Sequence, residues 1–256
     1  MLIAADNLNA LNPVVAEALE RLDKRPLQEL VRRLDQTGID LLDLNPGYLS
    51  LRNEDRMTFL VETVQEVSRT RLMLDSPHAR ILQRGLAACE RPPVLNALTL
   101  EEEKLRKILP LAAAARTDLV LLLLDERSMT PPTLEEKILL ALRLREAALS
   151  PGLEPTRLIF DPVLPNLSWP DAFDQTAAVV KTVRLLASGA ILGEPGRTMA
   201  GLSNLRSGLR QMYPLEVEIT CLSLLAGAGL HIALLDALQP DLWRRVHLVQ
   251  QLQPGE

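Results

Sequence analysis

Short polar side chains end the apolar runs that we expect to be β-strands, and they are the clearest candidates for chemistry in this chain. All of them are carboxylates or carboxamides, and no Lys, Arg, His or Cys stands at these positions. Such a set offers hydrogen-bond acceptors, with donors only from the amide groups. The residues are Asp6, Asp43 with Asn45, Asp75, Asn96, Asp125, Asp161, Asn204 and Asp236.

These residue types argue against several kinds of active site. Zinc prefers His and Cys ligands, so we expect no metal centre at the strand ends. The sequence contains no GxSxG elbow, P-loop or GxGxxG fingerprint, which leaves a serine hydrolase or a mononucleotide site without support. A set without Lys or Arg also suits a phosphorylated sugar poorly.

The same residue types suit a planar heterocycle that carries adjacent N–H donors and a few ring acceptors. A carboxylate can accept two parallel hydrogen bonds from an amino group and a ring N–H, and a carboxamide can both donate and accept. The 2-amino-4-oxo edge of a pterin has this layout, but purines and other amidine-like ligands fit equally well. Asp and Asn also favour turns and helix N-caps, which explains any single one, such as Asp6 or Asp236, better than the whole set.

The elements that must position these residues alternate between strand and helix patterns. Residues 71–97 read as strand, helix, strand, and the rest of the chain repeats the arrangement. Eight strands, each followed by a helix, predict a (β/α)₈ TIM barrel, which we expect to form a single domain over residues 1–256. We also expect Thr99 to open a helix in a capping box with Glu102, and a further helix to be capped near Thr133. The predicted strands are 2–5, 39–44, 72–74, 94–95, 118–124, 158–160, 199–202 and 230–235.

Composition limits the partners and the compartment. The chain has 256 residues, of which 47% are hydrophobic, and its net charge of −5 argues against binding to nucleic acid. The first residues, MLIAADNLN, lack the basic region of a signal peptide. No apolar run approaches the roughly 18 residues that a membrane helix needs. We therefore expect a cytoplasmic protein without a membrane partner.

Five stretches, taken in order, resemble the pterin-binding (β/α)₈ family. Within that family, the branch that this sequence resembles most looks like the methyltetrahydrofolate:corrinoid/iron–sulfur protein methyltransferases. Residues 61–68 and 99–110 add weaker matches, so the resemblance covers nearly the whole chain. The five stretches are Asp43-Leu44-Asn45-Pro46-Gly47, Leu74-Asp75-Ser76, Leu95-Asn96, Ile159-Phe160-Asp161-Pro162 and Gly201-Leu202-Ser203-Asn204.

The resemblance implies a role for each matching residue. Asp75, Asn96 and Asp161 match the ligands of the pterin ring, and Asp43 with Asn45 matches the pocket floor. Asn204 matches the catalytic asparagine that hydrogen-bonds near the methyl-bearing nitrogen. We add Asp125 and Ser203 to the expected pterin-binding set because of their positions at strand ends.

The activity that the resemblance implies is the transfer of a methyl group between tetrahydrofolate and cobalt. The cobalt belongs to a corrinoid (cobalamin) cofactor, which is held on a partner protein. A neutral asparagine can strengthen its hydrogen bond to the nitrogen as charge develops there, which stabilises the transition state selectively. Members of this branch are homodimers, and the resemblance implies the same here.

Departures from the family pattern keep two other functions open. Ala97-Leu98 replaces a pair of small residues with a hydroxyl group, Asp6-Asn7 stands where the family has Glu-Arg, Asp125 replaces an asparagine, and Tyr213 falls near a family arginine. A pterin-binding barrel that has lost catalysis would tolerate these changes. The sister branch, dihydropteroate synthase, would need a phosphate-binding Arg and Lys where this chain reads Ser203-Asn204-Leu205-Arg206.

Overall fold

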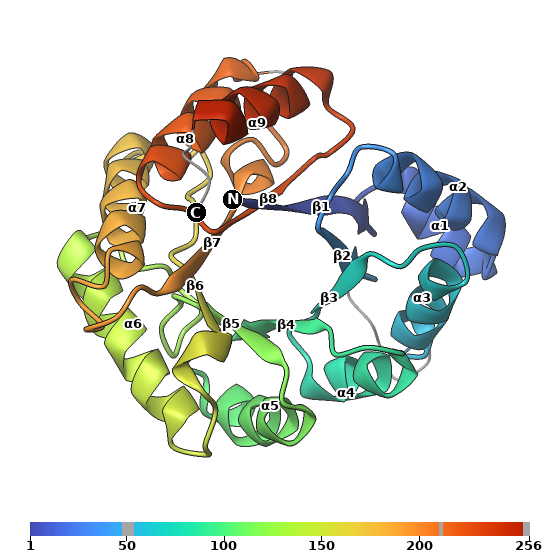
Figure 1. Ribbon diagram of the computed structural model, residues 1–256, viewed down its shortest axis with the longest axis horizontal. Coiled ribbons are helices and arrows are strands. Elements are labelled where there is room, and N and C mark those ends of the chain that lie inside the picture. Colours follow the sequence, from blue (N-terminus) through green and yellow to red (C-terminus); the bar gives the residue numbers. More distant parts are fainter. Residues whose placement is uncertain (48–53, 210–211, 253–256) are drawn as a thin grey trace.

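Eight parallel strands form a closed barrel in which β1 to β8 are neighbours in chain order and β8 pairs with β1 (Figure 1). The computed structural model describes residues 1–47, 54–209 and 212–252, and every structural statement below concerns these residues. The prediction of a TIM barrel is confirmed. The strands are β1 (Leu2–Asn9), β2 (Leu41–Asn45), β3 (Arg71–Asp75), β4 (Val94–Leu98), β5 (Asp118–Leu122), β6 (Leu158–Asp161), β7 (Arg197–Gly201) and β8 (Ile232–Leu235).

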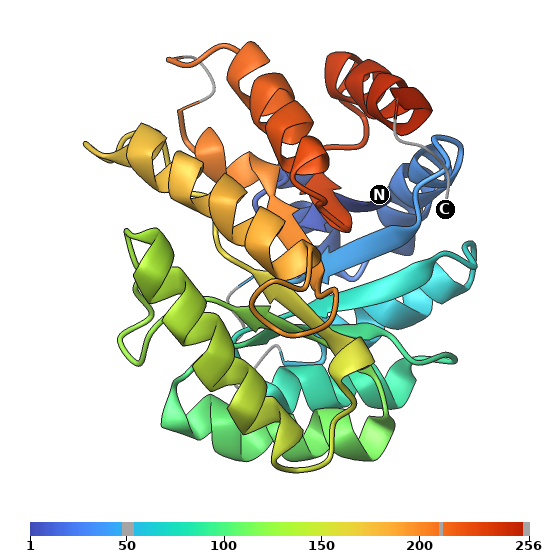
Figure 2. The same ribbon diagram turned by 60° about the vertical axis from the view of Figure 1, so that its left-hand side comes forward.

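Helices surround the barrel as an outer ring, which Figures 1 and 2 show from two directions. Two of them, α1 and α2, follow β1, and short 3₁₀ turns η1 and η2 lie before β6 and after β7. The described helices are α1 (Pro13–Arg21), α2 (Lys24–Asp35), α3 (Arg56–Gln65), α4 (Ala79–Ala88), α5 (Glu102–Ala115), α6 (Leu134–Leu149), α7 (Ala172–Ala187), α8 (Glu216–Gly227) and α9 (Pro240–Leu252), with η1 (Pro155–Arg157) and η2 (Leu202–Leu205).

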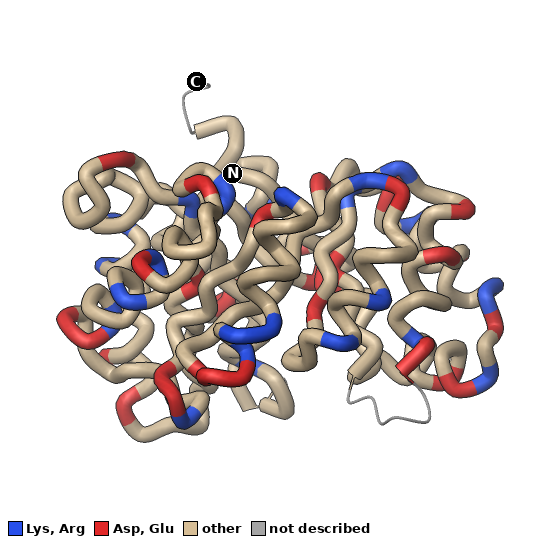
Figure 3. The backbone as a smooth tube through the Cα atoms, turned by 90° about the horizontal axis from the view of Figure 1, so that it is seen from below, with Lys and Arg blue, Asp and Glu red and all other residues tan. Residues whose placement is uncertain are grey.

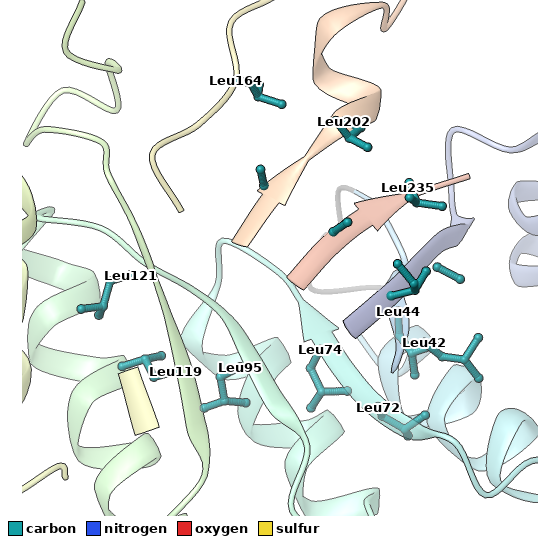
Figure 4. Close-up of a cluster of buried hydrophobic side chains, with 14 of the residues drawn as sticks. Leu42, Leu44, Leu72, Leu74, Leu95, Leu119, Leu121, Leu164, Leu202 and Leu235 are labelled. Carbon is teal, nitrogen blue, oxygen red and sulfur yellow. The ribbon is translucent and has the colours of Figure 1, made fainter. Parts of the chain in front are cut away.

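The strands alternate between two apolar layers, as the period of two along a β-strand requires. One layer packs against the helices, and Figure 4 shows part of it, including Leu42 and Leu44 on β2 beside Leu72 and Leu74 on β3. The other layer fills the inside of the barrel, because it takes one residue from every strand and none from a helix. Its members are Ala4, Leu41, Met73, Val94, Val120, Ile159, Met199 and Ile232, with Ala97 as a second residue from β4.

Charged residues stand mostly on the outer helices, where basic and acidic positions are interleaved along the backbone (Figure 3). The amino-terminal end of the barrel is an exception. There Asp118, at the start of β5, is buried and accepts hydrogen bonds at Oδ2 from Arg71 and from Arg197, both at 3.0 Å. The guanidinium group of Arg157 lies 3.9 Å from its Oδ1. We call these four residues the basal cluster.

Some predicted boundaries were wrong in ways that affect the site. β1 does not end at Ala5 but continues to Asn9, with an irregularity in its pairing with β2 between Ala5 and Leu8, so Asp6 lies within the strand. Thr99 does not cap a helix, because α5 begins at Glu102 and the Thr99 hydroxyl accepts from the backbone N–H of Glu101 instead. The N-cap at Thr133 is confirmed, and it forms a capping box with Glu136.

No helix in the described part of the chain is long and apolar enough to cross a membrane.

Candidate active site at the carboxyl ends of the strands

One interior position beyond the apolar layer, toward the carboxyl ends of the strands, five of the eight strands carry a polar residue, and we call these residues the polar layer. Each member of the polar layer stands two residues after a member of the apolar one, so its side chain also points into the barrel. Four acids and one amide fill these positions on five strands. The polar layer consists of Asp6, Asp43, Asp75, Asn96 and Asp161, and the same position is taken by Leu122 on β5, Gly201 on β7 and Leu234 on β8.

Side chains at the carboxyl ends of β2, β3 and β4 contact one another, and Asn45, the last residue of β2, takes part. Asn45 donates from Nδ2 to Oδ2 of Asp75 at 2.7 Å, and its own Oδ1 accepts from the Gly47 N–H at 2.9 Å. Asn96 stands opposite Asp75 in the pairing of β3 with β4, and its side chain lies close enough to Asp43 to lower the pKa of that carboxyl. The peptide bond between Asn96 and Ala97 is cis. The three strand ends therefore present one connected set of acceptors.

Asp43 is the most deeply buried acid of this set, with 1% of its surface exposed. Its Oδ1 has no hydrogen-bond partner within the described residues. Burial raises the pKa of the Asp43 carboxyl well above its usual range, and the negative charges of Asp75 and Asp6 raise it further. An unpartnered acceptor in such a place is a position where a ligand N–H would be stabilised.

Asp75 and Asp161 also have raised pKa values. Burial raises the pKa of Asp75 to about 6, against the opposing effect of the hydrogen bond from Asn45. Burial raises the pKa of Asp161 to about 7, although the N–H of Val163 and the charge of Lys137 both lower it. Buried acids with perturbed pKa values, gathered at one end of a barrel, are typical of a binding or catalytic site.

Lys137 is a site residue that sequence reasoning missed. It lies on α6, it is fully buried, and its ammonium group faces Asp161 closely enough to influence the pKa of that carboxyl. Chemistry was expected only at strand ends, and Lys137 stands in the first turns of a helix. Its helical spacing was the available signal, because it stands three and four residues before Leu140 and Ala141, which are also buried.

Asn204 lies at the mouth of the barrel, in η2 directly after β7. Its side chain is exposed, and no hydrogen bond of its carboxamide to another described residue is present, whereas its backbone oxygen accepts from Asn166 Nδ2 at 3.3 Å. A Cβ added to Gly201 would meet the Asn204 Nδ2 at 3.5 Å, so the missing side chain leaves this edge of the polar layer open toward Asn204. Ser203 lies beside it and is half-buried.

Two other predicted residues use their carboxylates to build loops. Asp125 stands three residues beyond the end of β5, and its Oδ1 accepts from the N–H groups of Arg127 and Met129 at 2.8 and 2.9 Å. These bonds lower the pKa of Asp125. Asp236 accepts from Asn7 Nδ2 at 2.6 Å, which links the ends of β8 and β1. The interior position of β5 belongs to Leu122 rather than to Asp125.

A family model described as "Pterin binding enzyme" matches residues 9–235 of this chain. The protein belongs to the pterin-binding enzyme family. A curated relative, the methylcorrinoid:tetrahydrofolate methyltransferase of Eubacterium limosum, is 26% identical over 245 residues, which cover 94% of this chain and 87% of the relative.

Solved structures of dihydropteroate synthases share the fold of this pterin-binding family member. The enzyme from Vibrio fischeri matches with a TM-score of 0.70 at 18% identity, covering 99% of this chain and 94% of that one. The enzyme from Xanthomonas albilineans, solved with 4-aminobenzoic acid, matches with a TM-score of 0.69 at 20% identity, covering 98% and 93%. At these identities the likeness supports the barrel fold alone.

The polar layer has the chemistry that a member of the pterin-binding family needs. A pterin has ring and amino N–H groups on one edge. Asp43 and Asp161 are buried carboxylates, Asp75 is half-buried, and Oδ1 of Asp43 has no donor among the described residues. Asn96 adds an amide that can donate to a ring acceptor. The predicted roles of Asp75, Asn96, Asp161, Asp43, Asn45 and Ser203 as pterin contacts stay predictions, as does that of Asp125.

Proposed function

We propose that this protein transfers a methyl group between methyltetrahydrofolate and the cobalt of a corrinoid carried by a partner protein. The observation that supports this function best is the combination of a buried acidic layer with an unengaged carboxamide, that of Asn204, at its open edge. The name of the Eubacterium limosum relative, a methylcorrinoid:tetrahydrofolate methyltransferase that aligns with 94% of this chain, is consistent with the same reaction. The corrinoid supplies the metal that takes up or gives back the methyl group.

The buried acids would hold the pterin by its edge of N–H donors. An ionised Asp161 or Asp75 can accept two parallel hydrogen bonds from an amino group and a ring N–H. Asn96 would face the adjacent ring atoms, while the unpartnered Oδ1 of Asp43 would accept a further N–H below them. The apolar interior layer beneath these residues excludes water from the floor, which strengthens each of these bonds.

Asn204 would act on the nitrogen that carries the methyl group. When the nitrogen–carbon bond breaks, its electron pair stays on the nitrogen, so the nitrogen becomes a stronger hydrogen-bond acceptor. A carboxamide N–H near that atom therefore stabilises the transition state more than the bound substrate. The open position at Gly201 gives the Asn204 side chain room to reach a ligand in the barrel mouth.

We also propose that residues 1–256 act as one domain, that two copies form a homodimer and that the corrinoid protein docks over the barrel mouth. Exposed apolar side chains on the outer helices, such as Leu139 on α6 and Leu224 on α8, are candidates for the dimer surface. Light scattering of the purified protein would test the homodimer, and a monomeric mass would overturn it.

The decisive experiment mixes the protein with methyltetrahydrofolate and free Co(I) cobalamin under anaerobic conditions and follows the corrinoid absorption. Conversion to methylcobalamin is expected.

The Asn204→Ala variant should lower turnover by ten-fold or more while changing pterin affinity less than three-fold, because the hydrogen bond of Asn204 matters mainly in the transition state. Asn204→Asp retains the size and an acceptor but loses the donor, so it should be equally slow. Equal losses in turnover and affinity would make Asn204 a plain ligand.

A barrel that binds pterin without catalysis is the second candidate, and the departures from the family pattern favour it. It predicts no methyl transfer but saturable quenching of Trp169, which lies partly exposed in the loop after β6. Dihydropteroate synthase has less support. Arg206, the basic residue nearest to the end of β7, is buried and donates to the Tyr213 backbone oxygen and to Glu218, so its guanidinium group turns toward α8 and away from a phosphate in the barrel mouth.

A further inference from the structure

Lys137 is a buried cation in a place where neither the helix nor the core favours one. It is the fourth residue of α6, close to the positive end of the helix dipole, and it is fully buried. Burial lowers the pKa of its ammonium group to about 8. A methionine or leucine would fill the same volume without these penalties, so the positive charge needs a compensating role.

The Lys137 ammonium group is fixed by two hydrogen bonds. It donates to the backbone oxygen of Pro162 at 2.9 Å and to Oγ1 of Thr130 at 2.8 Å. Pro162 directly follows Asp161, the last residue of β6. The lysine therefore connects α6 to the turn in which Asp161 leaves the barrel wall.

That turn has an unusual backbone. Val163 has a φ of +58°, a left-handed conformation that a β-branched residue rarely adopts. In this conformation the Val163 N–H reaches back to Oδ1 of Asp161 at 2.8 Å. The bond from Lys137 to Pro162 holds the middle of the turn, so it helps to keep the Asp161 side chain in one orientation.

Within the described part of the chain, few other charges act on this pair. There, Asp161 and Glu136 are the acids whose charges reach Lys137, and Lys137 and Asp75 are the charged groups that reach Asp161. Glu136 already accepts from the Thr133 hydroxyl and backbone in the capping box. Asp161 is thus the buried acid on which the charge of Lys137 acts.

We infer that Lys137 is a positioning residue that holds the Asp161 carboxylate in its charged form, and in the orientation of the turn, for a ligand that offers N–H donors. This inference rests on the proposed pterin site, but it does not depend on methyl transfer. Two of the three N–H donors of the Lys137 ammonium group are engaged by the protein. Its effect on the ligand is transmitted through Asp161.

The first test measures the affinity for 5-methyltetrahydrofolate against pH for the whole protein and for Lys137→Met. The affinity of the wild type should rise with pH as Asp161 ionises. In Lys137→Met the midpoint of this rise should lie higher by one pH unit or more, and the affinity at pH 7 should be lower by ten-fold or more. Lys107→Met removes an exposed lysine of α5 that pairs with Glu103, and it should behave like wild type. In an Asp161→Asn background, Lys137→Met should change affinity less than two-fold. An unmoved pH profile, or an equal loss in the Asp161→Asn background, would overturn the inference.

The second test needs neither ligand nor the Lys137 variant. The titration of the Lys137 ammonium group, followed by NMR of ¹⁵N-lysine, should move to lower pH in Asp161→Asn than in wild type, because the stabilising negative charge is gone. An identical titration would overturn the inference even if Lys137→Met fails to fold. If the coupling is present but 5-methyltetrahydrofolate does not bind to wild type, the pterin site fails and the link between Lys137 and Asp161 stands.

Discussion

The two ends of the barrel treat buried carboxylates in opposite ways. At the amino-terminal end, one acid, Asp118, is surrounded by three arginines of the basal cluster. At the carboxyl-terminal end, Asp43, Asp75 and Asp161 are buried or nearly buried. Among the described residues, the buried Lys137 influences Asp161 but not the other two, and Oδ1 of Asp43 has no partner. One end neutralises its buried charge and the other accumulates it.

The geometry of the basal cluster explains what its charges do. Arg71 begins β3 and Arg197 begins β7, which are on opposite sides of an eight-stranded barrel, and both donate to the same oxygen of Asp118 on β5. The carboxylate therefore ties two facing walls together. Among the described residues, the polar layer at the other end makes no such tie, and its raised pKa values are those expected of the ligand site proposed above.

The largest effect on stability is expected at the basal cluster. Asp118→Ala should lower the free energy of unfolding by about 2–4 kcal/mol, because three arginines then face one another without a carboxylate. Urea unfolding measures the change. Asp241→Ala removes an exposed acid of α9 that pairs with Arg244, and it should cost less than about 0.5 kcal/mol. Equal losses of unfolding free energy in the two variants would show that the basal cluster stabilises the barrel no more than a surface ion pair does.

A substitution in the polar layer is expected to stabilise the protein rather than destabilise it. Asp43→Asn should raise the free energy of unfolding by about 1–2 kcal/mol at pH 8, because it removes a buried acid that Asp75 and Asp6 repel. The same substitution should weaken pterin binding by about 1–3 kcal/mol, since an acceptor is lost. Asp174→Asn, on the exposed surface of α7, is the control for both measurements. A destabilised Asp43→Asn would mean that the layer is structural.

Stability should also depend on pH through this layer. Asp75 and Asp161 have folded-state pKa values of about 6 and about 7, above the roughly 3.9 of an unfolded aspartate. Between about pH 4 and pH 7 the folded state holds more protons than the unfolded state, so stability falls as the pH rises. Thermal unfolding across this range should show the decline in the ligand-free protein. The Asp75→Asn/Asp161→Asn variant should show a shallower decline, although Asp43 still contributes to it, and an unchanged slope would refute the assignment.

The smallest effect is expected at Asp125. Asp125→Asn keeps the Oδ1 acceptor for Arg127 and Met129 and restores the residue type of the resembling family, so stability should change by less than about 1 kcal/mol. Pterin affinity, measured by calorimetry, should change less than two-fold if the carboxylate serves only its loop. A ten-fold loss would place Asp125 against the ligand, as the sequence predicts.

Sequence patterns predicted the strands well but located the site only approximately. Asp43, Asp75, Asn96 and Asp161 were found because each stands at or near the end of an apolar run. Asp6 was taken for a strand end, although it lies inside β1, and Asp125 was placed with the others because the apolar run of β5 extends past its last paired residue. Whether a carboxylate points into the barrel depends on its spacing from the interior residue of the same strand. An apolar run in the sequence does not show at which residue the pairing between neighbouring strands ends.

The contact between Lys137 and the turn after β6 could not be inferred from the sequence. The neighbours of Lys137 in the chain predict a helix, and a lysine there would ordinarily reach solvent. Its burial depends on the packing of α6 against the barrel beside the turn after β6, a contact between segments about 25 residues apart that no local pattern encodes.

The sequence by itself determined the alternation of strand and helix, the barrel that follows from it and the residue types gathered at its mouth. These depend on hydrophobic periodicity and on the preferences of Asp and Asn, which act over a few residues. The tertiary structure alone decided which carboxylates point inward, which are satisfied by the protein and which remain partly unsatisfied. Closing the barrel brings eight distant strands into one register, and burial and charge then act across the interior rather than along the chain.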